Sequence, residues 1–330
     1  MRVLFWPIHG SYASAFFQGA HEYLVPWSPD GGPFASGRGG YDDFWPANVV
    51  EVPVESLREQ PVDVVVLQRL EELELAERWL GRRPGRDVPA LYLEHNAPRG
   101  DVTGMLHPLA DRKDLPLVHV THFNAAFWDS GRAPVTVVEH GVVDPGHRYT
   151  GELPHLGVTI NEPARRRRVT GADLLPRFAR AGHVDLFGID GGLLGPAIGM
   201  GPDDLTWVGD IPMTRMQPLL AQRRVYLHPN RWTSLGLSLL EAMHLGMPVV
   251  AFASTEALRA VPPEVGVLST DVEELVAGAA RLLRDPEEAR RRGDAARAVV
   301  LERYGLARFV AAWDTVLADT VARAGRSTPG

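Results

Sequence analysis

The residues with the clearest chemical pattern lie in the stretch HPNRWTSLGLSLLEAMHLGMPVV, residues 228–250. The apolar run Val225–Leu227 predicts a buried strand before it, and the leucine spacing inside it predicts a helix, with Ser234 as its N-cap. The start of a helix has unpaired backbone N–H groups and partial positive charge, so it attracts anions such as phosphate. Gly236 has no Cβ and lets a ligand come close to the backbone.

Glu241 lies five residues beyond Gly236, within the expected helix. A carboxylate there can accept hydrogen bonds from the two hydroxyls of a ribose. From the pattern alone, the simpler interpretation is an ordinary crossover turn with Glu241 on a solvated helix face. Helix starts with serine and glycine are common, so this pattern by itself does not establish a binding site.

The stretch resembles the donor-site signature of the retaining glycosyltransferases of family 4, which have the GT-B fold. The matching residues are Pro229, Gly236, Leu237, Leu240, Glu241, Ala242, Met243, Gly246, Pro248, Val249 and Val250. One departure concerns charge, because the first glutamate of the family signature falls on Thr233. Asn230 stands where the signature has an early serine, and Ser234 and Leu235 replace its usual glycine and phenylalanine.

The resemblance implies an α/β protein with two doubly wound Rossmann-like domains that face each other across a cleft. Residues 1–150 are then the N-terminal, acceptor-binding domain, and residues 151–305 are the C-terminal domain that binds a nucleotide-sugar donor. A final helix, about 306–325, is expected to pack back on the first domain; the alternative is that it simply caps the second. The alternation of expected strands and helices along the chain agrees with two parallel sheets.

The function that the resemblance implies is a retaining, hexosyltransferase-type glycosyltransferase. Its donor is a nucleotide-diphosphate sugar with UDP, GDP or dTDP, and its acceptor is a small molecule or a glycan. Two alternatives stay open. One is a non-catalytic GT-B partner or nucleotide-binding protein, since Thr170 and Thr233 replace charged residues of the family pattern. The other is a nucleotide-sugar epimerase on the same fold.

The expected site residues fall into two groups. His95 is the expected catalytic residue, because it follows the expected strand Ala90–Glu94 at the sheet edge where such folds bind ligands, and several family members have a histidine there beside the reacting sugar carbon. A lone histidine at such a place is more often structural. The expected donor-binding residues are Gly10, Ser11, Arg165, Asn230, Thr233, Ser234, Gly236, Leu237 and Glu241.

Arg165 begins a run of four arginines, Arg165–Arg168. Such a run is usually a solvated face. In the resembled family an arginine and a lysine shortly before a glycine hold the donor diphosphate, and counting back from Gly171 places Arg165 on the arginine and Thr170 on the lysine. The lysine is therefore missing, and one of Arg166–Arg168 is a candidate to replace it, because arginine binds phosphate in a bidentate way.

No metal and no cofactor are expected. The sequence has no cysteine and no Asp-x-Asp, the motif that holds a divalent ion in other glycosyltransferases. His119 and His122 are three residues apart, but no third ligand is close to them in sequence, so packing is the simpler role. The charge of the leaving diphosphate is then balanced by arginine, backbone N–H groups and the helix dipole.

The composition is that of an ordinary globular protein. The 330 residues carry a net charge of −7, which disfavours a nucleic-acid partner. No apolar run reaches the length of about 20 residues that spans a bilayer, and the N-terminus resembles a first strand more than a signal peptide. We therefore expect a cytoplasmic protein without a transmembrane segment, and peripheral contact with a membrane is left open.

Several local predictions position these residues. We expect a first strand at Val3–Trp6, a loop through Gly10 and Ser11, and a helix over residues 14–24. The loop rich in Gly, Pro and aromatic residues at 26–48 is expected to be a substrate-facing flap or disordered. Residues 161–168 are expected to be a basic loop, and the domain boundary is expected near 147–155.

Overall fold

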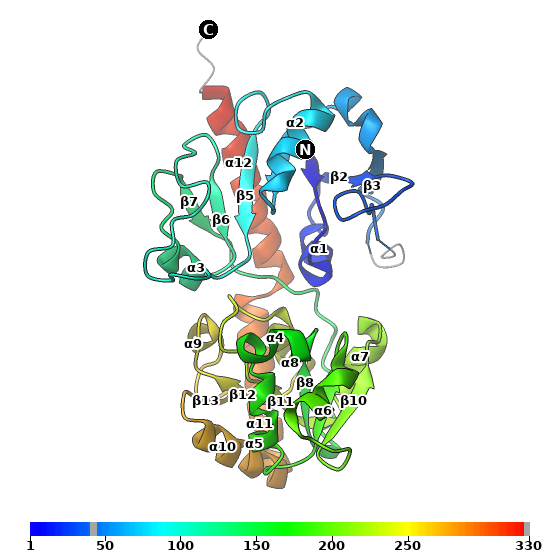
Figure 1. Cartoon of the computed structure of the whole chain (residues 1–330), viewed down its shortest axis with the longest axis vertical. Coiled ribbons are helices and arrows are strands. Elements are labelled where there is room, and N and C mark those ends of the chain that lie inside the picture. The colour runs from blue at the N-terminus through cyan, green and yellow to red at the C-terminus, as the bar shows by residue number, and fades with distance from the viewer. Residues whose placement is uncertain (40–44, 327–330) are drawn as a thin grey trace. The chain divides into compact units, whose positions relative to one another are not determined.

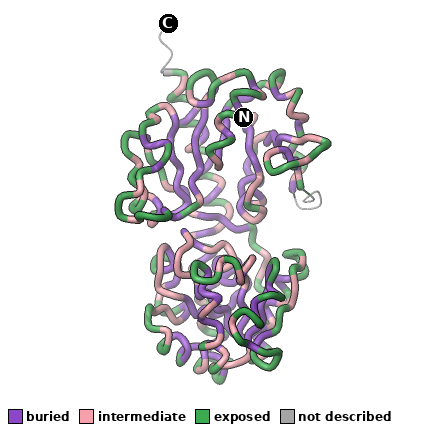
Figure 2. The backbone as a smooth tube through the Cα atoms, viewed as in Figure 1, coloured by how far each residue is buried: buried purple, intermediate pink, exposed green. Residues whose placement is uncertain are grey.

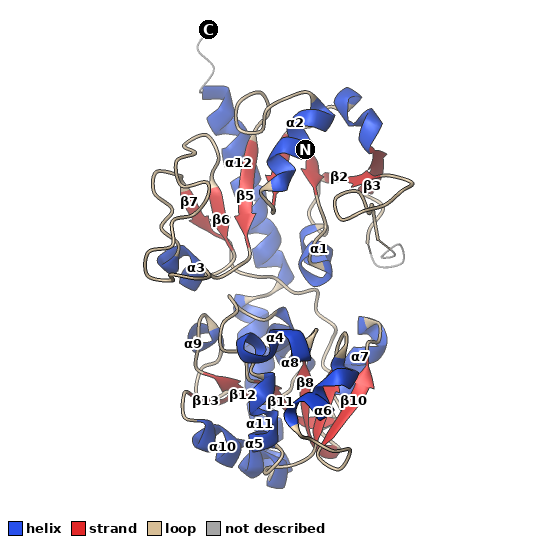
Figure 3. Ribbon diagram, viewed as in Figure 1, coloured by secondary structure: helices blue, strands red, loops and turns tan. Residues whose placement is uncertain are grey.

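The computed structural model describes residues 1–39 and 45–326, and the chain divides into two compact units. The first contains residues 1–143 together with the C-terminal segment that begins at Leu306, and the second contains residues 144–305. Each unit has one sheet, in which every strand pairing is parallel, with helices around it (Figure 1; Figure 3). Among the described helices, none is both long and apolar enough to span a membrane.

The sheet of the first unit has the strand order β3-β2-β1-β4-β5-β6-β7. Its central strands are largely apolar and are buried on both faces, which is typical of parallel sheets (Figure 2). The strands are β1 (Arg2–Phe5), β2 (Glu22–Trp27), β3 (Val49–Pro53), β4 (Val64–Leu67), β5 (Ala90–Glu94), β6 (Leu117–His119) and β7 (Val135–Val137). The helices are α1 (Gly10–Phe16), the short 3-10 helix η1 (Val54–Glu59), α2 (Glu71–Leu80), α3 (His122–Phe127) and α12 (Leu306–Arg326).

The C-terminal helix α12 is part of the core of the first unit. It packs against α1, β4 and β5. Phe309, Trp313 and Leu317 lie on its buried face, and the Trp313 indole N–H donates a hydrogen bond to the Tyr12 hydroxyl over 3.0 Å. The amphipathic spacing of these residues explains why the helix forms and which face it buries.

The sheet of the second unit has the strand order β10-β9-β8-β11-β12-β13. Its strands are β8 (Leu153–Thr159), β9 (Val184–Phe187), β10 (Leu205–Gly209), β11 (Arg223–His228), β12 (Val249–Phe252) and β13 (Gly266–Ser269). The α-helices are α4 (Pro163–Thr170), α5 (Leu175–Phe178), α6 (Leu194–Ile198), α7 (Met213–Leu220), α8 (Leu237–Leu245), α9 (Ala257–Ala260), α10 (Val272–Arg284) and α11 (Pro286–Arg303). Two short 3-10 helices, η2 (Ala172–Leu174) and η3 (Gly191–Leu193), precede α5 and α6.

The segment 144–150, which we expected at the end of the first domain, lies in the second unit. Its backbone is held there by hydrogen bonds: the amides of Arg148 and Tyr149 donate to the carbonyl of Leu245, and the amide of Thr150 donates to the carbonyl of Ala221. Because both acceptors end helices of the second unit, the connecting segment satisfies carbonyls that those helices leave unpaired.

Two local predictions were wrong. The helix expected over residues 14–24 is α1, which begins at Gly10 and ends at Phe16, and β2 begins at Glu22. The aromatic and branched residues Tyr23–Val25 fill the sheet core instead of extending the helix. The basic loop expected at 161–168 is largely α4: Pro163 fits a first helical turn, and Gly171 ends the helix in the left-handed conformation.

The flap expected at residues 26–48 is only partly described, because residues 40–44 lie outside the described residues. The described part does not begin as a loop: its first two residues end β2, and Trp27 also forms an isolated bridge with Ser36. The role of this stretch therefore stays a prediction.

Candidate functional site

The turn between β11 and α8 lies at the middle of the second sheet. β11 pairs with β8 on one side and β12 on the other, so the strand order changes direction between β8 and β11. In open parallel sheets this reversal leaves a crevice outside the carboxyl ends of the strands, and ligands bind there. Residues 229–236 form this turn, and α8 begins at Leu237 with Gly236 as its N-cap (Figure 1).

The N-cap prediction for Ser234 was wrong. The loop continues two residues further, and the N-cap residue of α8 is Gly236. Ser234 is buried, and its carbonyl accepts a hydrogen bond from the amide of Glu256 over 3.3 Å. The N-cap position of this helix therefore falls on a glycine.

A glycine is needed at position 236 because of the neighbouring side chain of His228, and not because of the backbone conformation. The Gly236 φ of −70° is open to any residue, but a Cβ at this position would lie 2.5 Å from Cε1 of His228. The buried His228 ring has its Nε2 3.2 Å from the Asn230 side-chain amide, and burial lowers its pKa to about 4. A neutral imidazole therefore packs against the turn at Gly236 and Asn230.

Glu241 is buried in α8, with 6% of its surface exposed. The interpretation that placed it on a solvated helix face is therefore wrong. Thr233 and Asn230 are half-buried, and the Asn230 carbonyl accepts a hydrogen bond from the Ser254 hydroxyl over 2.8 Å. The turn is thus held by β12 and its following loop as well as by β11.

The end of α4 lies directly beside this turn. The backbone amides of Arg231 and Trp232 donate to the carbonyl of Val169. A Cβ at Gly171 would come within 1.9 Å of the carbonyl oxygen of Pro229, so only glycine fits at that contact. The arginine-bearing helix and the β11–α8 turn are therefore one local assembly.

The structure places the arginines of α4 differently from one another. The side chain of Arg165 is 68% exposed and donates from Nε to the Glu162 carboxylate over 2.8 Å. Arg167 donates to the carbonyl of Ala197, and Arg168 pairs with Asp173. An exposed ion pair is weak, so the pairing with Glu162 leaves Arg165 able to change partner.

Thr170 stands where the resembled family has a lysine, and it is buried, with its hydroxyl 3.4 Å from the carbonyl of Arg166. It offers no charge to a ligand. Arg231 was missed by the sequence reasoning: it is in the turn itself, donates to the Arg168 carbonyl, and forms two hydrogen bonds with Asp173 at 2.6 and 3.1 Å. Its place as the one arginine within the stretch 228–250 could have indicated it.

In the first unit, His95 follows β5 at the carboxyl edge of the sheet. Its Nε2 lies 2.8 Å from Gln68 Oε1, and the Gln68 amide nitrogen donates to the carbonyl of Trp6. This second bond fixes the orientation of the Gln68 amide, so Nε2 of His95 carries the proton and Nδ1 is the acceptor of the ring. Burial, assisted by His9 and His140, holds the pKa of His95 well below its usual value, so it is neutral near pH 7.

Other residues that the sequence reasoning missed surround His95. The His9 ring lies 4.6 Å from it and the Tyr12 ring 4.7 Å, between ring centroids. His140 is 4% exposed, neither of its ring nitrogens has a hydrogen-bond partner in the described part of the chain, and burial lowers its pKa to about 4. His9 and His140 share one feature that the sequence could have shown: each is a histidine a few residues beyond the end of a strand.

Gly10 and Ser11, expected in a loop, are instead the first residues of α1. His9 precedes them as the N-cap residue. Gly10 and Ser11 therefore lie near His95 in the first unit, while the remaining predicted donor residues lie in the second unit. Their assignment as donor-binding residues stays a prediction.

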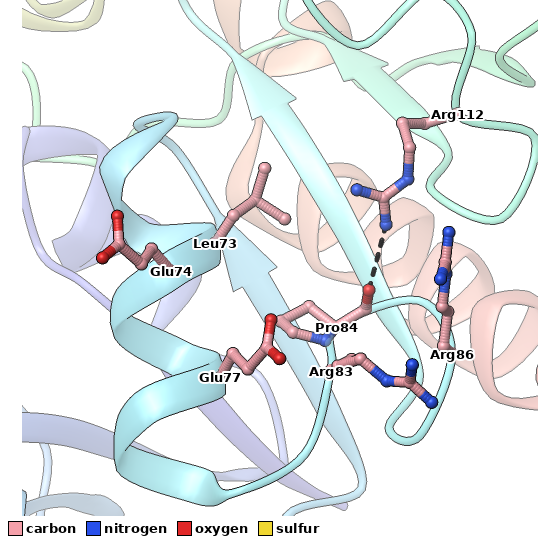
Figure 4. A pocket seen from close by; sticks show the side chains of 7 residues that line it. All are labelled: Leu73, Glu74, Glu77, Arg83, Pro84, Arg86 and Arg112. Atoms are coloured by element: carbon pink, nitrogen blue, oxygen red, sulfur yellow. Dashed lines mark hydrogen bonds between the residues drawn. The ribbon is translucent and has the colours of Figure 1, made fainter.

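A shallow pocket of about 270 Å³ lies elsewhere in the first unit, between α2 and the loop that leads into β5 (Figure 4). Its charges are largely satisfied locally: Arg83 pairs with Asp87, Arg112 pairs with Asp114, and Arg112 also donates to the carbonyl of Pro84. It is on the side where β5 begins, whereas His95 follows the end of that strand. We assign it no role in the chemistry. Its lining residues are Leu73, Glu74, Glu77, Arg83, Pro84, Arg86 and Arg112.

Comparison with known proteins agrees with this geometry. Residues 200–299 match the family model described as Glycosyl transferases group 1, and this range contains the whole β11–α8 turn. A stretch of 108 residues is 36% identical to the MMP alpha-(1->4)-mannosyltransferase of Mycolicibacterium hassiacum. That match covers 32% of this chain and 25% of the relative, so the chain spans about a quarter of that protein's length.

Two solved structures resemble the chain over nearly its full length. Anabaena HepE, in complex with UDP and glucose, superposes with a TM-score of 0.72 at 15% identity, over 97% of this chain and 100% of HepE. The sucrose-phosphate synthase of Thermosynechococcus elongatus gives a TM-score of 0.70 at 15% identity, over 98% and 100% of the two chains. The chain therefore has the GT-B fold, and the predicted fold class is confirmed.

Proposed function

We propose that this protein is a glycosyltransferase that takes a sugar from a nucleotide-diphosphate donor. The observation that carries the proposal is the coincidence of the group 1 match with a helix that begins at a glycine, at the reversal point of a parallel sheet. Such a helix start, next to an arginine-bearing helix, suits a diphosphate. HepE, which shares the fold, was solved with UDP and with UDP-glucose, which agrees with a donor of this class.

In this proposal the amides at Gly236 and Leu237 bind the diphosphate, and Arg165 releases Glu162 to bind it as well. Glu241 binds the ribose hydroxyls, and its burial inside α8 gives its carboxylate a fixed position. Asn230, Thr233 and Ser234 line the sugar side of the turn. The base is uracil, guanine or thymine, and UDP has the support of the structural relatives.

His95 acts at the reacting sugar. The Gln68 amide fixes the orientation of the ring with the proton on Nε2, and we place this oriented, neutral imidazole beside a hydroxyl of the sugar. A neutral ring at pH 7 can make such a contact without adding a positive charge beside the departing sugar. The retaining outcome and the transfer of a hexose, as in family 4, are part of the proposal and rest on the sequence resemblance.

The proposed reaction needs no metal at the donor diphosphate, since the chain has no Asp-x-Asp and arginine, amides and the helix dipole supply positive charge. The proposed partners are the donor and a small-molecule or glycan acceptor, without nucleic acid. We also propose a cytoplasmic location, which agrees with the absence of cysteine.

A non-catalytic GT-B protein is the second candidate. The observation that favours it is the loss of two charges of the family pattern: a buried threonine, Thr170 at the end of α4, replaces a lysine, and Thr233 replaces a carboxylate. Arg231 and the intact stretch from Gly236 to Val250 favour the enzyme instead.

A nucleotide titration tests the proposal. UDP, GDP and dTDP are titrated against the wild type and Glu241→Gln by calorimetry, with thermal unfolding as a check on the fold. We expect one nucleotide to bind the wild type and to bind the variant at least tenfold more weakly. Equal affinity at an unchanged melting temperature would remove Glu241 from the site, and no nucleotide binding by the wild type would overturn the proposal.

A further inference from the structure

Two histidines and an aspartate meet at the opposite edge of the second sheet from the β11–α8 turn. His155 lies near the start of β8, His183 immediately precedes β9, and Asp185 is the second residue of β9. The strands are parallel, so these residues gather at the amino ends, where β8 and β9 are neighbours. No residue of the proposed donor site belongs to this group.

The possible ligand atoms of these three residues are close enough together to share one metal ion. Each residue offers a ligand atom within 4.8 Å of the others. Nδ1 of His155 is 2.9 Å from Asp185 Oδ2, and Nε2 of His183 is 3.5 Å from Asp185 Oδ1. Ligands of a tetrahedral zinc ion, about 2.0–2.2 Å from the metal, lie roughly 3.3–3.5 Å from one another.

The surrounding hydrogen bonds orient the ligands. Nδ1 of His183 is 2.9 Å from the carbonyl of Asp203, so it carries the proton, and Nε2 has a lone pair directed toward Asp185 and the Thr206 hydroxyl. Metal-bound histidines typically donate their second ring N–H in this way. Nε of Arg223 donates to Asp185 Oδ2 over 2.8 Å, which holds the carboxylate in place and leaves Oδ1 toward His183.

The group is also accessible from solvent. The side chains of His155 and His183 are 33% and 20% exposed, while Asp185 is 4% exposed. A partly exposed pair of imidazoles over a buried carboxylate gives an ion a route of entry and leaves a position for water as a further ligand.

We propose that His155, His183 and Asp185 form a zinc-class site at the amino edge of the second sheet. Two imidazoles and one carboxylate suit Zn²⁺, Co²⁺ or Ni²⁺, whereas Mg²⁺ and Ca²⁺ prefer all-oxygen ligands. In the ion-free structure Nδ1–H of His155 donates to Asp185 Oδ2 over 2.9 Å. Ion binding moves the His155 proton to Nε2, so that His155 binds through Nδ1, His183 through Nε2 and Asp185 through Oδ1. The ion joins β8 to β9, and Thr206 and Arg223 extend the bonded group to β10 and β11, so its role is structural.

The experiment uses the full chain without a histidine tag, freed of metal by a chelator. Zn²⁺ is titrated by calorimetry, Co²⁺ is followed by its visible absorption, and thermal unfolding is recorded with and without Zn²⁺. We expect one equivalent of Zn²⁺, a Co²⁺ spectrum with nitrogen ligation, and a melting temperature about 5 °C or more higher at a zinc concentration about 100 times the dissociation constant. Mg²⁺ should give none of these responses.

His183→Ala and His155→Ala should each weaken Zn²⁺ binding at least tenfold and abolish the Co²⁺ spectrum. His122→Ala is the matched control, because His122 is exposed and lies in the first unit. Asp185→Asn is a second test only if it melts like the wild type without metal, since Arg223 also depends on that carboxylate. Equal zinc binding by His183→Ala and the wild type, or a loss of the bound equivalent in His122→Ala, would overturn the site.

Discussion

The imidazole of His228 lies so close under Gly236 that a single methyl group on the glycine would approach its Cε1 to 2.5 Å. His228 is the last residue of β11 and Gly236 is the last residue of the β11–α8 turn, and the ring is almost fully buried. The ring cannot rotate away freely, because Asn230 is bonded to its Nε2. The position of the start of α8 is therefore set by a packing contact between the strand and the helix that the turn connects.

Gly236→Ala should displace the turn and destabilise the second unit by about 1–3 kcal/mol, the usual cost of overpacking. His228→Ala removes the ring, so the double variant should be more stable than the sum of the two single changes indicates. Urea unfolding of the four proteins measures this coupling. Simple additivity would show that the two residues do not press on one another.

Arg165→Ala should weaken binding of the nucleotide diphosphate by about 1.5–3 kcal/mol, the usual scale for a hydrogen bond to a charged group. Arg167→Ala is the control, because its side chain is bonded to the carbonyl of Ala197. Calorimetric titration of both variants measures the difference. If Arg165→Ala binds normally and Arg231→Ala does not, the cation that binds the diphosphate is in the turn and not on α4.

His95→Ala should lower kcat much more than it raises KM, because a contact to the reacting sugar strengthens in the transition state. The pKa of His95 is well below its usual value, so wild-type kcat should show no inflection from this residue between pH 6 and pH 8. His122→Ala, which changes an exposed histidine after β6, should leave both constants unchanged. A change confined to KM in His95→Ala would make His95 an acceptor-binding or packing residue.

His119 should make the first unit sensitive to acid. Burial lowers its pKa from 6.5 to about 4, so the unfolded chain takes up a proton below pH 6.5 while the folded chain stays neutral until about pH 4. Its stabilising contribution is complete above pH 6.5 and is lost as the pH falls toward 4, which amounts to about 2 kcal/mol at pH 5. His119→Leu should reduce the loss of unfolding free energy between pH 7.5 and pH 5 by that amount. An unchanged loss would show that His119 is protonated in the folded state.

Parts of the fold followed from the sequence because their patterns were local. The run Ala90–Glu94 is β5 with the bounds expected, and the stretch after Val225 gave strand, turn and helix in the right order. β2 and β3 were missed, because their short runs are interrupted by polar residues and by Pro26, and only pairing with β1 makes β2 a strand. Tertiary pairing decides such segments, and single-sequence periodicity does not contain it.

Site residues could be predicted only where they lie close together in one segment of the sequence. Gly236, Leu237 and Glu241 lie within one stretch of sequence, so a motif could identify them. The histidines around His95 come from the ends of different strands, and His155 with Asp185 are brought together by strand pairing. Ser234 was misplaced because its residue type suits an N-cap, whereas the N-cap position of α8 falls two residues later, on Gly236.

Thr233→Glu should shift the sugar preference rather than abolish activity. A carboxylate accepts two hydrogen bonds from a diol, whereas threonine has a single hydroxyl group for hydrogen bonding. The wild type should therefore discriminate weakly between a hexose and its deoxy analogue. We expect the glutamate to favour the fully hydroxylated donor. Comparing kcat/KM for hexose and deoxyhexose donors in both proteins measures the change, and an unchanged ratio would place Thr233 away from the sugar.

The activity that we propose for this chain is cleavage of the bond between a sugar and a nucleoside diphosphate. The most direct measurement is release of the nucleoside diphosphate by the purified protein from UDP-, GDP- and dTDP-sugars, with and without a broad acceptor panel. We expect release from at least one donor by the wild type, and strongly reduced release by folded Glu241→Gln and His95→Ala. No release from any donor with any acceptor, by a folded protein that binds a nucleotide, would contradict the claim and favour the non-catalytic GT-B protein.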